Sequence, residues 1–207
     1  MPVNSGRLIA FEGIDGSGKS TQLEHLVAAL RAAGHDVVAT AEPTQGAWGR
    51  RIREMARSGA AVSAAEELRW FVEDRREHVA ELIRPALEAG RLVVTDRYYL
   101  SSVAYQGARG LDWRQILAES EAEFPTPDLV LLLEVGTEAG LSRVAQRGAV
   151  REAVFEDAAR LGRVASIFAA LDRSYIERIP TAAGVDEVAV AVRERVQRQL
   201  SLPRAPS

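Results

Sequence analysis

Cysteine is absent from this chain of 207 residues, and asparagine and lysine occur once each. Without cysteine there can be no disulfide, thiolate zinc site or cysteine nucleophile. Because Asn4 is the only asparagine, neither a protein-kinase catalytic loop nor the Asn-Lys-x-Asp motif that reads guanine can be present. Lys19 is one of 26 basic residues and the other 25 are arginines, so the single lysine is a place to look for chemistry.

Long apolar runs and a strong excess of one charge are missing too. No apolar run approaches the roughly 18 residues of a membrane helix. Glu12 and Asp15 interrupt the only stretch that could be a signal peptide. The formal net charge of −3 excludes the broad basic surface that duplex nucleic acid requires. We therefore expect a soluble, cytoplasmic protein that binds neither nucleic acid nor membranes.

The order of sequence patterns predicts an α/β fold. Short apolar runs, which suit buried parallel strands, alternate with longer helical patterns. Strands are expected at 7–12, 36–41, 91–96 and 128–135, with a weaker fifth near 179–183. Helices are expected at 19–33, 48–57, 64–89 (kinked by Pro85), 112–123, 137–146, 152–178 and 186–200. This pattern predicts a doubly wound parallel five-stranded sheet flanked by helices, in one domain over 1–200 with a disordered tail at 201–207.

A glycine-rich loop lies between the first predicted strand and the first predicted helix. Residues 13–20 read GIDGSGKS and fit G-x-x-x-x-G-K-[ST] in the strand–loop–helix context that this phosphate-binding motif needs. Its glycines let backbone N–H groups face phosphate oxygens, and the helix N-terminus adds partial positive charge. Lys19 can reach the β- and γ-phosphates, and the Ser20 hydroxyl can bind Mg²⁺. The residues expected to bind ATP are Gly13, Ile14, Asp15, Gly16, Ser17, Gly18, Lys19, Ser20 and Thr21.

The loop by itself does not name a reaction, because switches, motors, transporters and kinases all share it. A GTPase would lack its guanine motif here, and ABC-type ATPases and large motors need a longer chain. A small nucleoside or nucleotide kinase fits the length best.

A second candidate cluster ends the third predicted strand, at the sheet edge where open α/β sheets bind ligands. Asp96 is placed to hold Mg²⁺ or its water shell. Arg97 follows and can neutralise a phosphate that enters opposite ATP. A structural ion pair at a strand end is the alternative, and the P-loop nearby makes it the weaker one.

Together these segments resemble the thymidylate (dTMP) kinase family of P-loop nucleotide kinases. The resemblance covers about residues 7–178, and the segment DRYYLSSVAYQ at 96–106 separates this family from other monophosphate kinases. The other matching segments are the P-loop at 11–21, Glu42-Pro43, FVEDR at 71–75, PDLVLLLE at 127–134 and Arg147-Gly148. The resemblance implies a homodimer that uses Mg²⁺, with ATP and dTMP as substrates.

The resemblance also implies roles for single residues. Phe71 would stack on thymine and Arg75 would hydrogen-bond it, and their i, i+4 spacing independently places both on one helix face. A core aromatic and a solvated charge are the alternatives for these two. Asp15 would accept the sugar 3′-hydroxyl or act near the metal, and Glu42 would lie near the transferred phosphoryl group unless it caps a helix. The sugar and base pocket would be lined by Ser102, Tyr105 and Gln106, with the tyrosine crowding the ribose 2′ position.

One departure from the family pattern concerns the acceptor phosphate. The family commonly has an arginine beside the Glu-Pro element, but here Ala41 precedes Glu42. Either an arginine of the next helix reaches the phosphate, or Arg97 carries more of that task. The helix offers Arg50, Arg51 and Arg53.

A second departure concerns the P-loop, where Gly16 leaves no arginine. Catalytic charge is therefore expected from a lid at about 147–155, as in the bacterial-type members of the family. Arg147 and Arg151 are the candidates and Arg143 could compete with them, while an ordinary surface arginine is the alternative for each.

The sequence thus predicts transfer of the ATP γ-phosphoryl group to dTMP, giving dTDP and ADP for dTTP synthesis. Because the acceptor is already an anion, catalysis would rest on positioning and charge neutralisation. The catalytic candidates are Lys19, Arg97, Asp15, Arg147 and Arg151. Two alternatives stay open: another kinase acting on UMP, CMP or a deoxynucleoside, and a P-loop protein that holds ATP without turnover.

Overall fold

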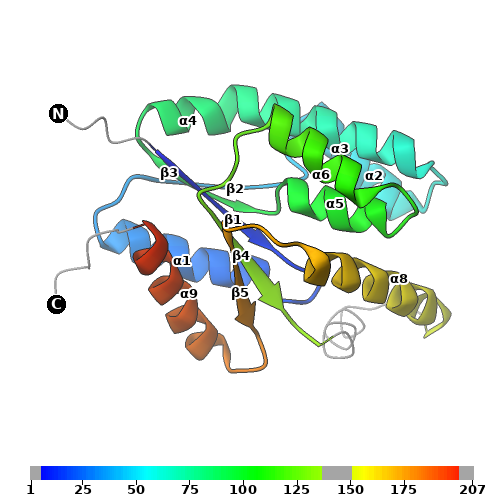
Figure 1. Cartoon of the computed structure of the whole chain (residues 1–207). Coiled ribbons are helices and arrows are strands. Elements are labelled where there is room, and N and C mark those ends of the chain that lie inside the picture. Colours follow the sequence, from blue (N-terminus) through cyan, green and yellow to red (C-terminus); the bar gives the residue numbers. More distant parts are fainter. Residues whose placement is uncertain (1–5, 137–150, 201–207) are drawn as a thin grey trace.

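Five parallel strands form a sheet at the centre of the molecule (Figure 1). The structure is a computed structural model that describes residues 6–136 and 151–200, with 151–157 described by their helical backbone alone. The strands are β1 (Arg7–Glu12), β2 (Val37–Ala41), β3 (Leu92–Asp96), β4 (Leu129–Glu134) and β5 (Ile176–Pro180). Their order is β2-β3-β1-β4-β5, so β1 and the P-loop that follows it are central. The predicted doubly wound parallel sheet is confirmed.

Helices cover both faces of the sheet (Figure 1). One face carries α1 (Lys19–Ala32) and α9 (Val185–Leu200). The other carries α3 (Ala64–His78), α4 (Arg84–Glu88), α5 (Tyr99–Gly107), α6 (Trp113–Glu123) and α8 (Arg151–Ala170), and α2 (Ala47–Ser58) packs on α3. Side chains alternate along β1, so Leu8 and Ala10 enter one core while Ile9 and Phe11 enter the other.

The expected helix at 64–89 is interrupted near its kink. Between α3 and α4, residues Val79–Ile83 form a π-helical turn in which the Arg84 N–H donates to the Val79 carbonyl. Pro85 has no N–H to donate back into this turn, so the helix widens where the ordinary hydrogen-bond pattern cannot continue.

Three other elements differ from the expectations: one helix, the end of another helix, and the bounds of the fifth strand. Helix α5 was not expected, because nearly all of its residues are buried and its sequence therefore lacks an amphipathic repeat. The helix expected at 152–178 ends at Ala170, and the fifth strand is Ile176–Pro180 rather than 179–183. This strand lies at the sheet edge and is only partly buried, so it lacks the continuous apolar run of the inner strands. The helix expected at 137–146 lies outside the described residues.

Arg178 of β5 explains where α8 stops. Its Nη2 donates to the carbonyls of Phe168 (3.1 Å), Ala169 (3.1 Å) and Leu171 (2.8 Å), and its Nη1 donates to Glu134 Oε1 (2.6 Å). One guanidinium therefore satisfies the last carbonyls of α8 and ties them to the end of β4.

Replacing Arg178 with methionine should lower the free energy of unfolding by about 2 kcal/mol, because several charge-assisted hydrogen bonds are lost at a partly exposed site. Denaturant titration would measure this. Arg195→Met is the matched control, since Arg195 Nη1 donates to Glu177 at 2.9 Å in a partly exposed pair that should contribute about 0.5 kcal/mol. Equal losses in the free energy of unfolding from the two substitutions would contradict the role of Arg178 in joining the end of α8 to the end of β4.

Candidate active site

The P-loop lies against the end of β4 and opens into helix α1. Gly13 has φ 136°, and a Cβ at this position would stand 2.5 Å from the Leu133 carbonyl oxygen, so only glycine fits. Gly18 begins α1 with no side-chain hydrogen bond at the N-cap and no acidic residue in the first turn. The backbone donors of this helix end are thus left for an anionic ligand.

A cavity of about 730 Å³ lies in front of the P-loop, within the usual size of a ligand pocket. Residues 15–22 form one wall, and Glu42, Asp96 and Arg97 at the ends of β2 and β3 form another. Thr181, Ala183, Val185 and Val188 close the side near α9. Each of these segments follows the carboxyl end of a strand or begins a helix, as expected of an open α/β sheet.

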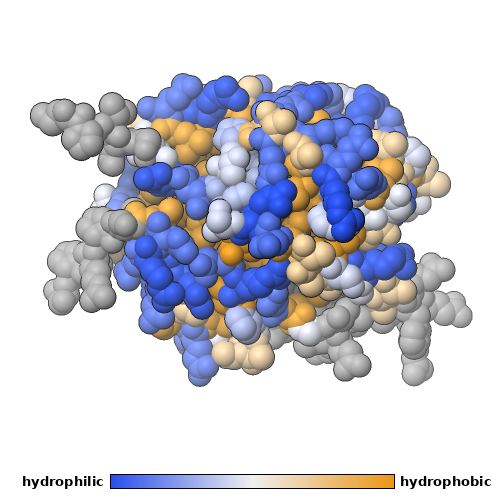
Figure 2. Space-filling view, viewed as in Figure 1, coloured by the Kyte–Doolittle hydropathy of each residue, from blue (hydrophilic) through white to orange (hydrophobic). Residues whose placement is uncertain are grey.

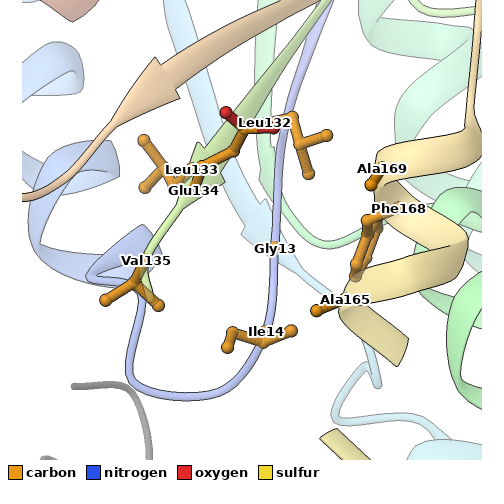
Figure 3. Close-up of a pocket in the computed structure, with 9 residues that line it drawn as sticks. All are labelled: Gly13, Ile14, Leu132, Leu133, Glu134, Val135, Ala165, Phe168 and Ala169. Carbon is orange, nitrogen blue, oxygen red and sulfur yellow. The ribbon is translucent and has the colours of Figure 1, made fainter. Parts of the chain in front are cut away.

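Gly13 and Ile14 line a different, smaller cavity of about 150 Å³ behind the P-loop. Figure 3 shows Ile14 on the loop side of this space, with Ala165 and Phe168 of α8 on the facing side. The lining is mostly apolar. In this structure Gly13 and Ile14 therefore shape the loop rather than line the larger cavity.

Two oxygen-bearing side chains that could bind a metal ion meet in the large cavity at the expected metal position. The Ser20 hydroxyl donates to Asp96 Oδ2 at 2.5 Å, and Asp96 Oδ1 is buried without a hydrogen-bond partner among the described residues. A hydroxyl and an unpartnered carboxylate oxygen fit a hard cation such as Mg²⁺. In the described ranges no group of three His, Cys, Asp or Glu side chains could hold a metal by itself. Further ligands would therefore come from the nucleotide phosphates and water.

Arg97 is held in the same cavity by three side chains. Its Nη2 donates to Asp15 Oδ1 (2.5 Å) and to the Tyr105 hydroxyl (3.4 Å), and its Nη1 donates to Ser101 Oγ (2.9 Å). Its backbone has φ 70°, a left-handed conformation that costs a non-glycine residue of order 1 kcal/mol. Such a conformation persists only where surrounding contacts impose it, which marks Arg97 as a functional candidate.

The charges around Arg97 favour an anionic ligand. Burial opposes the charge of Arg97, but Tyr105 and Asp15 outweigh it and raise its pKa. Burial also opposes ionisation of Asp15, yet Arg97 and Lys19 hold its pKa below the ordinary value. Burial and the charge of Arg97 lower the pKa of Lys19 to about 8, and its Nζ donates to the carbonyls of Gly13 (3.1 Å) and Ile14 (2.9 Å). Two cations thus surround one carboxylate, a combination that suits phosphate groups.

Arg75 lies at the centre of a second, buried cluster. It is 1% exposed, so the alternative of a solvated helix charge is wrong. Its Nε and Nη2 lie 2.9 and 2.7 Å from Glu42 Oε2, and its Nη2 donates to Ser102 Oγ at 3.0 Å. The other oxygen of Glu42 lies 3.1 Å from His78 Nδ1. Glu42 therefore pairs with Arg75 and does not cap helix α2, whose N-cap, Gly46, has no side-chain hydrogen bond.

The expected site residues fall into these two clusters. Asp15, Arg97 and Tyr105 form one, and Glu42, Arg75 and Ser102 form the other. Phe71 is half-buried on the same helix as Arg75, and Gln106 is buried on α5. Arg147 lies outside the described residues, and Arg151 begins α8 with its side chain outside them.

The three arginines of α2 make their contacts away from the P-loop. Arg50 Nη1 donates to the Gln45 carbonyl (2.7 Å), Arg53 Nη1 donates to the Pro43 carbonyl (2.9 Å), and Arg51 lies 4.0 Å from the centre of the Trp70 ring. Arg97, by contrast, contacts Asp15 of the P-loop directly.

Three residues of the site were missed by sequence reasoning: Glu12, Ser101 and His78. Glu12 stands at the end of a strand immediately before the P-loop, a position that could have singled it out. Ser101 and His78 carry no such local signal, because their partners lie in other elements.

The model of the thymidylate kinase family matches residues 11–192. The chain belongs to the thymidylate kinase family. It is 48% identical over 189 residues to a thymidylate kinase of Akkermansia muciniphila, covering 91% of this chain and 90% of that one. It is 44% identical over 202 residues to a thymidylate kinase of Desulfotalea psychrophila, covering 98% of this chain and all of that one. A thymidylate kinase of Xanthomonas euvesicatoria is 45% identical over 183 residues, or 88% and 80% of the two chains. Within the described residues, no helix is long and apolar enough to cross a membrane.

Proposed function

We propose that this protein is an ATP-dependent dTMP kinase, which transfers the γ-phosphoryl group of ATP to dTMP and releases dTDP and ADP. The observation that carries the proposal is the meeting of two clusters in a member of this family. The P-loop cavity with Lys19 and Arg97 lies beside the buried cluster of Glu42, Arg75 and Ser102, and Glu42 lines this cavity as well. Helix α5 joins them, because Ser101 contacts Arg97 while Ser102 contacts Arg75.

Two unpartnered atoms support a thymine-like base as the acceptor. Among the described residues, Arg75 Nη1 is a buried donor without an acceptor and Gln106 Oε1 is a buried acceptor without a donor. Ser102, which bonds Arg75, lies one helical turn before Gln106 and so on the same face of α5. Thymine and uracil offer a carbonyl next to an N–H, which matches this donor and acceptor, whereas cytosine offers an amino group next to a bare nitrogen. The unpartnered donor of Arg75 and the unpartnered acceptor of Gln106 thus favour dTMP over cytidine nucleotides.

The reaction needs no strong general base, because the attacking oxygen belongs to a phosphate anion. Lys19 and the α1 N-terminus would hold the ATP phosphates, and Arg97 would hold the acceptor phosphate for in-line attack. Ser20 and Asp96 would hold Mg²⁺, which when bound would neutralise negative charge on the phosphates. A lid arginine, Arg147 or Arg151, would complete the neutralisation. Asp15 and Tyr105, whose hydroxyl donates to Asp15 at 3.1 Å, would face the sugar.

The experiment that tests this function measures ADP release from Mg·ATP with dTMP, dUMP, UMP, CMP or no acceptor. We expect strong stimulation by dTMP. The rate with dUMP should be lower by about tenfold or more, because one methyl group in a pocket contributes about 1–3 kcal/mol. Preference for UMP or CMP would contradict the acceptor assignment and support another monophosphate kinase. Nucleotide binding without stimulation by any acceptor would indicate a non-catalytic ATP-binding protein.

The homodimer and the cytoplasmic location stay predictions from the family and the sequence. The apolar helix faces near Trp70 and Trp113 are compatible with a homodimer, but both side chains pack within this chain: Trp70 is buried, and Trp113 packs against the core. Figure 2 shows polar and apolar side chains interspersed on one face. The whole of the proposed lid at 147–155 and the whole tail at 201–207 lie outside the residues with described side chains.

A further inference from the structure

Glu12 is a buried carboxylate to which no role has been assigned so far. It ends β1 immediately before the P-loop, and it is 0% exposed. A buried carboxylate is costly unless hydrogen bonds compensate its lost hydration. Within the described part of the chain, the hydrogen bonds to this side chain come from one short segment, the start of α5.

The first set of bonds caps α5 from outside the helix. Glu12 Oε1 accepts the backbone N–H of Tyr98 at 2.9 Å and that of Ser101 at 3.1 Å. Helix α5 begins at Tyr99 with no side-chain hydrogen bond at its N-cap and no acidic residue in its first turn. The carboxylate that a helix N-terminus prefers is therefore supplied by the central strand.

The second set of bonds reaches Arg97 through a hydroxyl. The Ser101 Oγ–H donates to Glu12 Oε2 at 2.6 Å. Its single proton is thereby directed at the carboxylate, which leaves lone pairs to accept Arg97 Nη1 at 2.9 Å. The backbone N–H of Arg97 also donates to the Phe11 carbonyl at 2.9 Å, next to Glu12 in β1. The left-handed backbone and the guanidinium of Arg97 are thus both fixed from the end of β1.

We propose that Glu12 is a positioning residue for phosphoryl transfer, which fixes the guanidinium of Arg97 through the Ser101 hydroxyl. This role rests on the dTMP kinase activity proposed above, in which Arg97 holds the acceptor phosphate. The hydrogen-bond order Arg97→Ser101→Glu12 requires the ionised carboxylate, which only accepts, so kcat is compared at pH 8, above the pKa of about 7 of Glu12. An amide at position 12 would donate to Ser101 Oγ, and the serine proton would then lose its acceptor and disturb the bond to Arg97.

The expected result for Glu12→Gln is a fall in kcat of about 10- to 100-fold, since small displacements of a catalytic group have effects of this order. The KM for ATP should change by less than about threefold, because Lys19 and the P-loop are untouched. Ser101→Ala should lower kcat to a similar extent. If Glu12 acts through Ser101, adding Glu12→Gln to Ser101→Ala should lower kcat by less than about threefold more.

A structural role alone would give a different result, so thermal unfolding is measured on the same variants. Burial raises the pKa of Glu12 to about 7 against the lowering effects of the Ser101 hydrogen bond and the Arg97 charge. Arg97, Lys19 and Tyr99 are the titratable groups that face it. Between about pH 4.5 and 7 the folded protein then binds more protons at this site than the unfolded chain, so its stability falls as pH rises. The Tm of Glu12→Gln should therefore rise relative to wild type from pH 5 to pH 8.

Asp128→Asn is the matched control, because Asp128 likewise accepts hydrogen bonds from both the backbone and a side chain, namely the Leu8 N–H at 2.8 Å and Arg7 Nη1 at 2.8 Å. Asp128 immediately precedes β4, at the amino ends of the strands and away from the candidate active site at their carboxyl ends. The substitution should therefore change Tm and leave kcat unchanged. Unchanged kcat in Glu12→Gln, or kcat losses that multiply in the double variant, would overturn the proposal. If Glu12→Gln does not fold, unchanged kcat in Ser101→Ala overturns it. A wild-type protein that dTMP does not stimulate would instead refute the proposed function.

Discussion

Replacing Lys19 with methionine should lower kcat by about 10³-fold while the protein stays folded. The Nζ group lies inside the P-loop and donates to the Gly13 and Ile14 carbonyls. Among the described residues that line the cavity, the only other cation is Arg97, which lies on the opposite wall. Removal of one preorganised donor costs about 10²–10³-fold in kcat, and a charged one at the transferred phosphate lies at the upper end of this range.

Lys19→Met should raise the free energy of unfolding even though it lowers kcat. Because burial lowers the pKa of Lys19 to about 8, the folded protein binds fewer protons than the unfolded chain between about pH 8 and 10.5. The wild-type protein therefore loses stability as pH falls through this range, and methionine removes that dependence. ADP release and denaturant titration at pH 7 and pH 10 would measure both effects.

Two variants serve as controls for Lys19→Met. Lys19→Arg keeps the charge but places a larger group in the loop, so it should also be inactive if geometry matters. Arg31→Met removes a cation from the last turn of the same helix, where Arg31 Nη2 donates to the Val37 carbonyl at 3.0 Å, and should leave kcat unchanged. Retention of more than a tenth of kcat by Lys19→Met would exclude the assigned role.

Arg75→Met should destabilise the fold by about 3–5 kcal/mol and raise the KM for dTMP at least tenfold. Removal of the guanidinium leaves the Glu42 carboxylate buried without its main counter-charge, which is one of the costliest single changes in a protein interior. It also removes the unpartnered Nη1 donor that we assign to the thymine carbonyl. The KM for ATP should stay within about threefold of wild type, because the P-loop is untouched.

The double variant Arg75→Met/Glu42→Gln separates these two effects. Neutral side chains at both positions should recover most of the lost stability, whereas the affinity for dTMP should stay low. Denaturant titration and ADP release at varied dTMP would show this. Arg76→Met is the neighbouring control, because Arg76 pairs with Glu73 and Glu123 at the surface and should contribute less than about 1 kcal/mol. A normal KM for dTMP in the double variant would contradict the base-binding role of Arg75.

Most strands and several helices could be predicted because their signals are local. Buried strands such as β4 are continuous apolar runs, and Gly34 with φ 86° follows α1 as expected of a helix end. Helix α5 could not be predicted in this way. Its residues pack against α3, α6 and α8 together, so burial on nearly all sides removes the polar face that periodicity detects.

The sequence by itself determined the family and predicted the candidate phosphate site. Phosphate binding by a P-loop uses consecutive backbone N–H groups and one nearby lysine, so its chemistry is written in a few adjacent residues. Asp96 and Arg97 were also readable, because they end a buried strand at the edge where the sheet binds ligands.

The tertiary structure decided which charges are paired and which atoms are left for a ligand. Whether Arg75 is a solvated charge or a buried donor depends on Glu42 and Ser102, which lie 33 and 27 residues away in the chain. Likewise, Glu12 meets the N-terminus of α5 across 89 residues, because the β1–β3 register places Phe11 beside Asp96. Burial and hydrogen-bond partners of this kind are set by packing between distant segments, and no local sequence pattern records them.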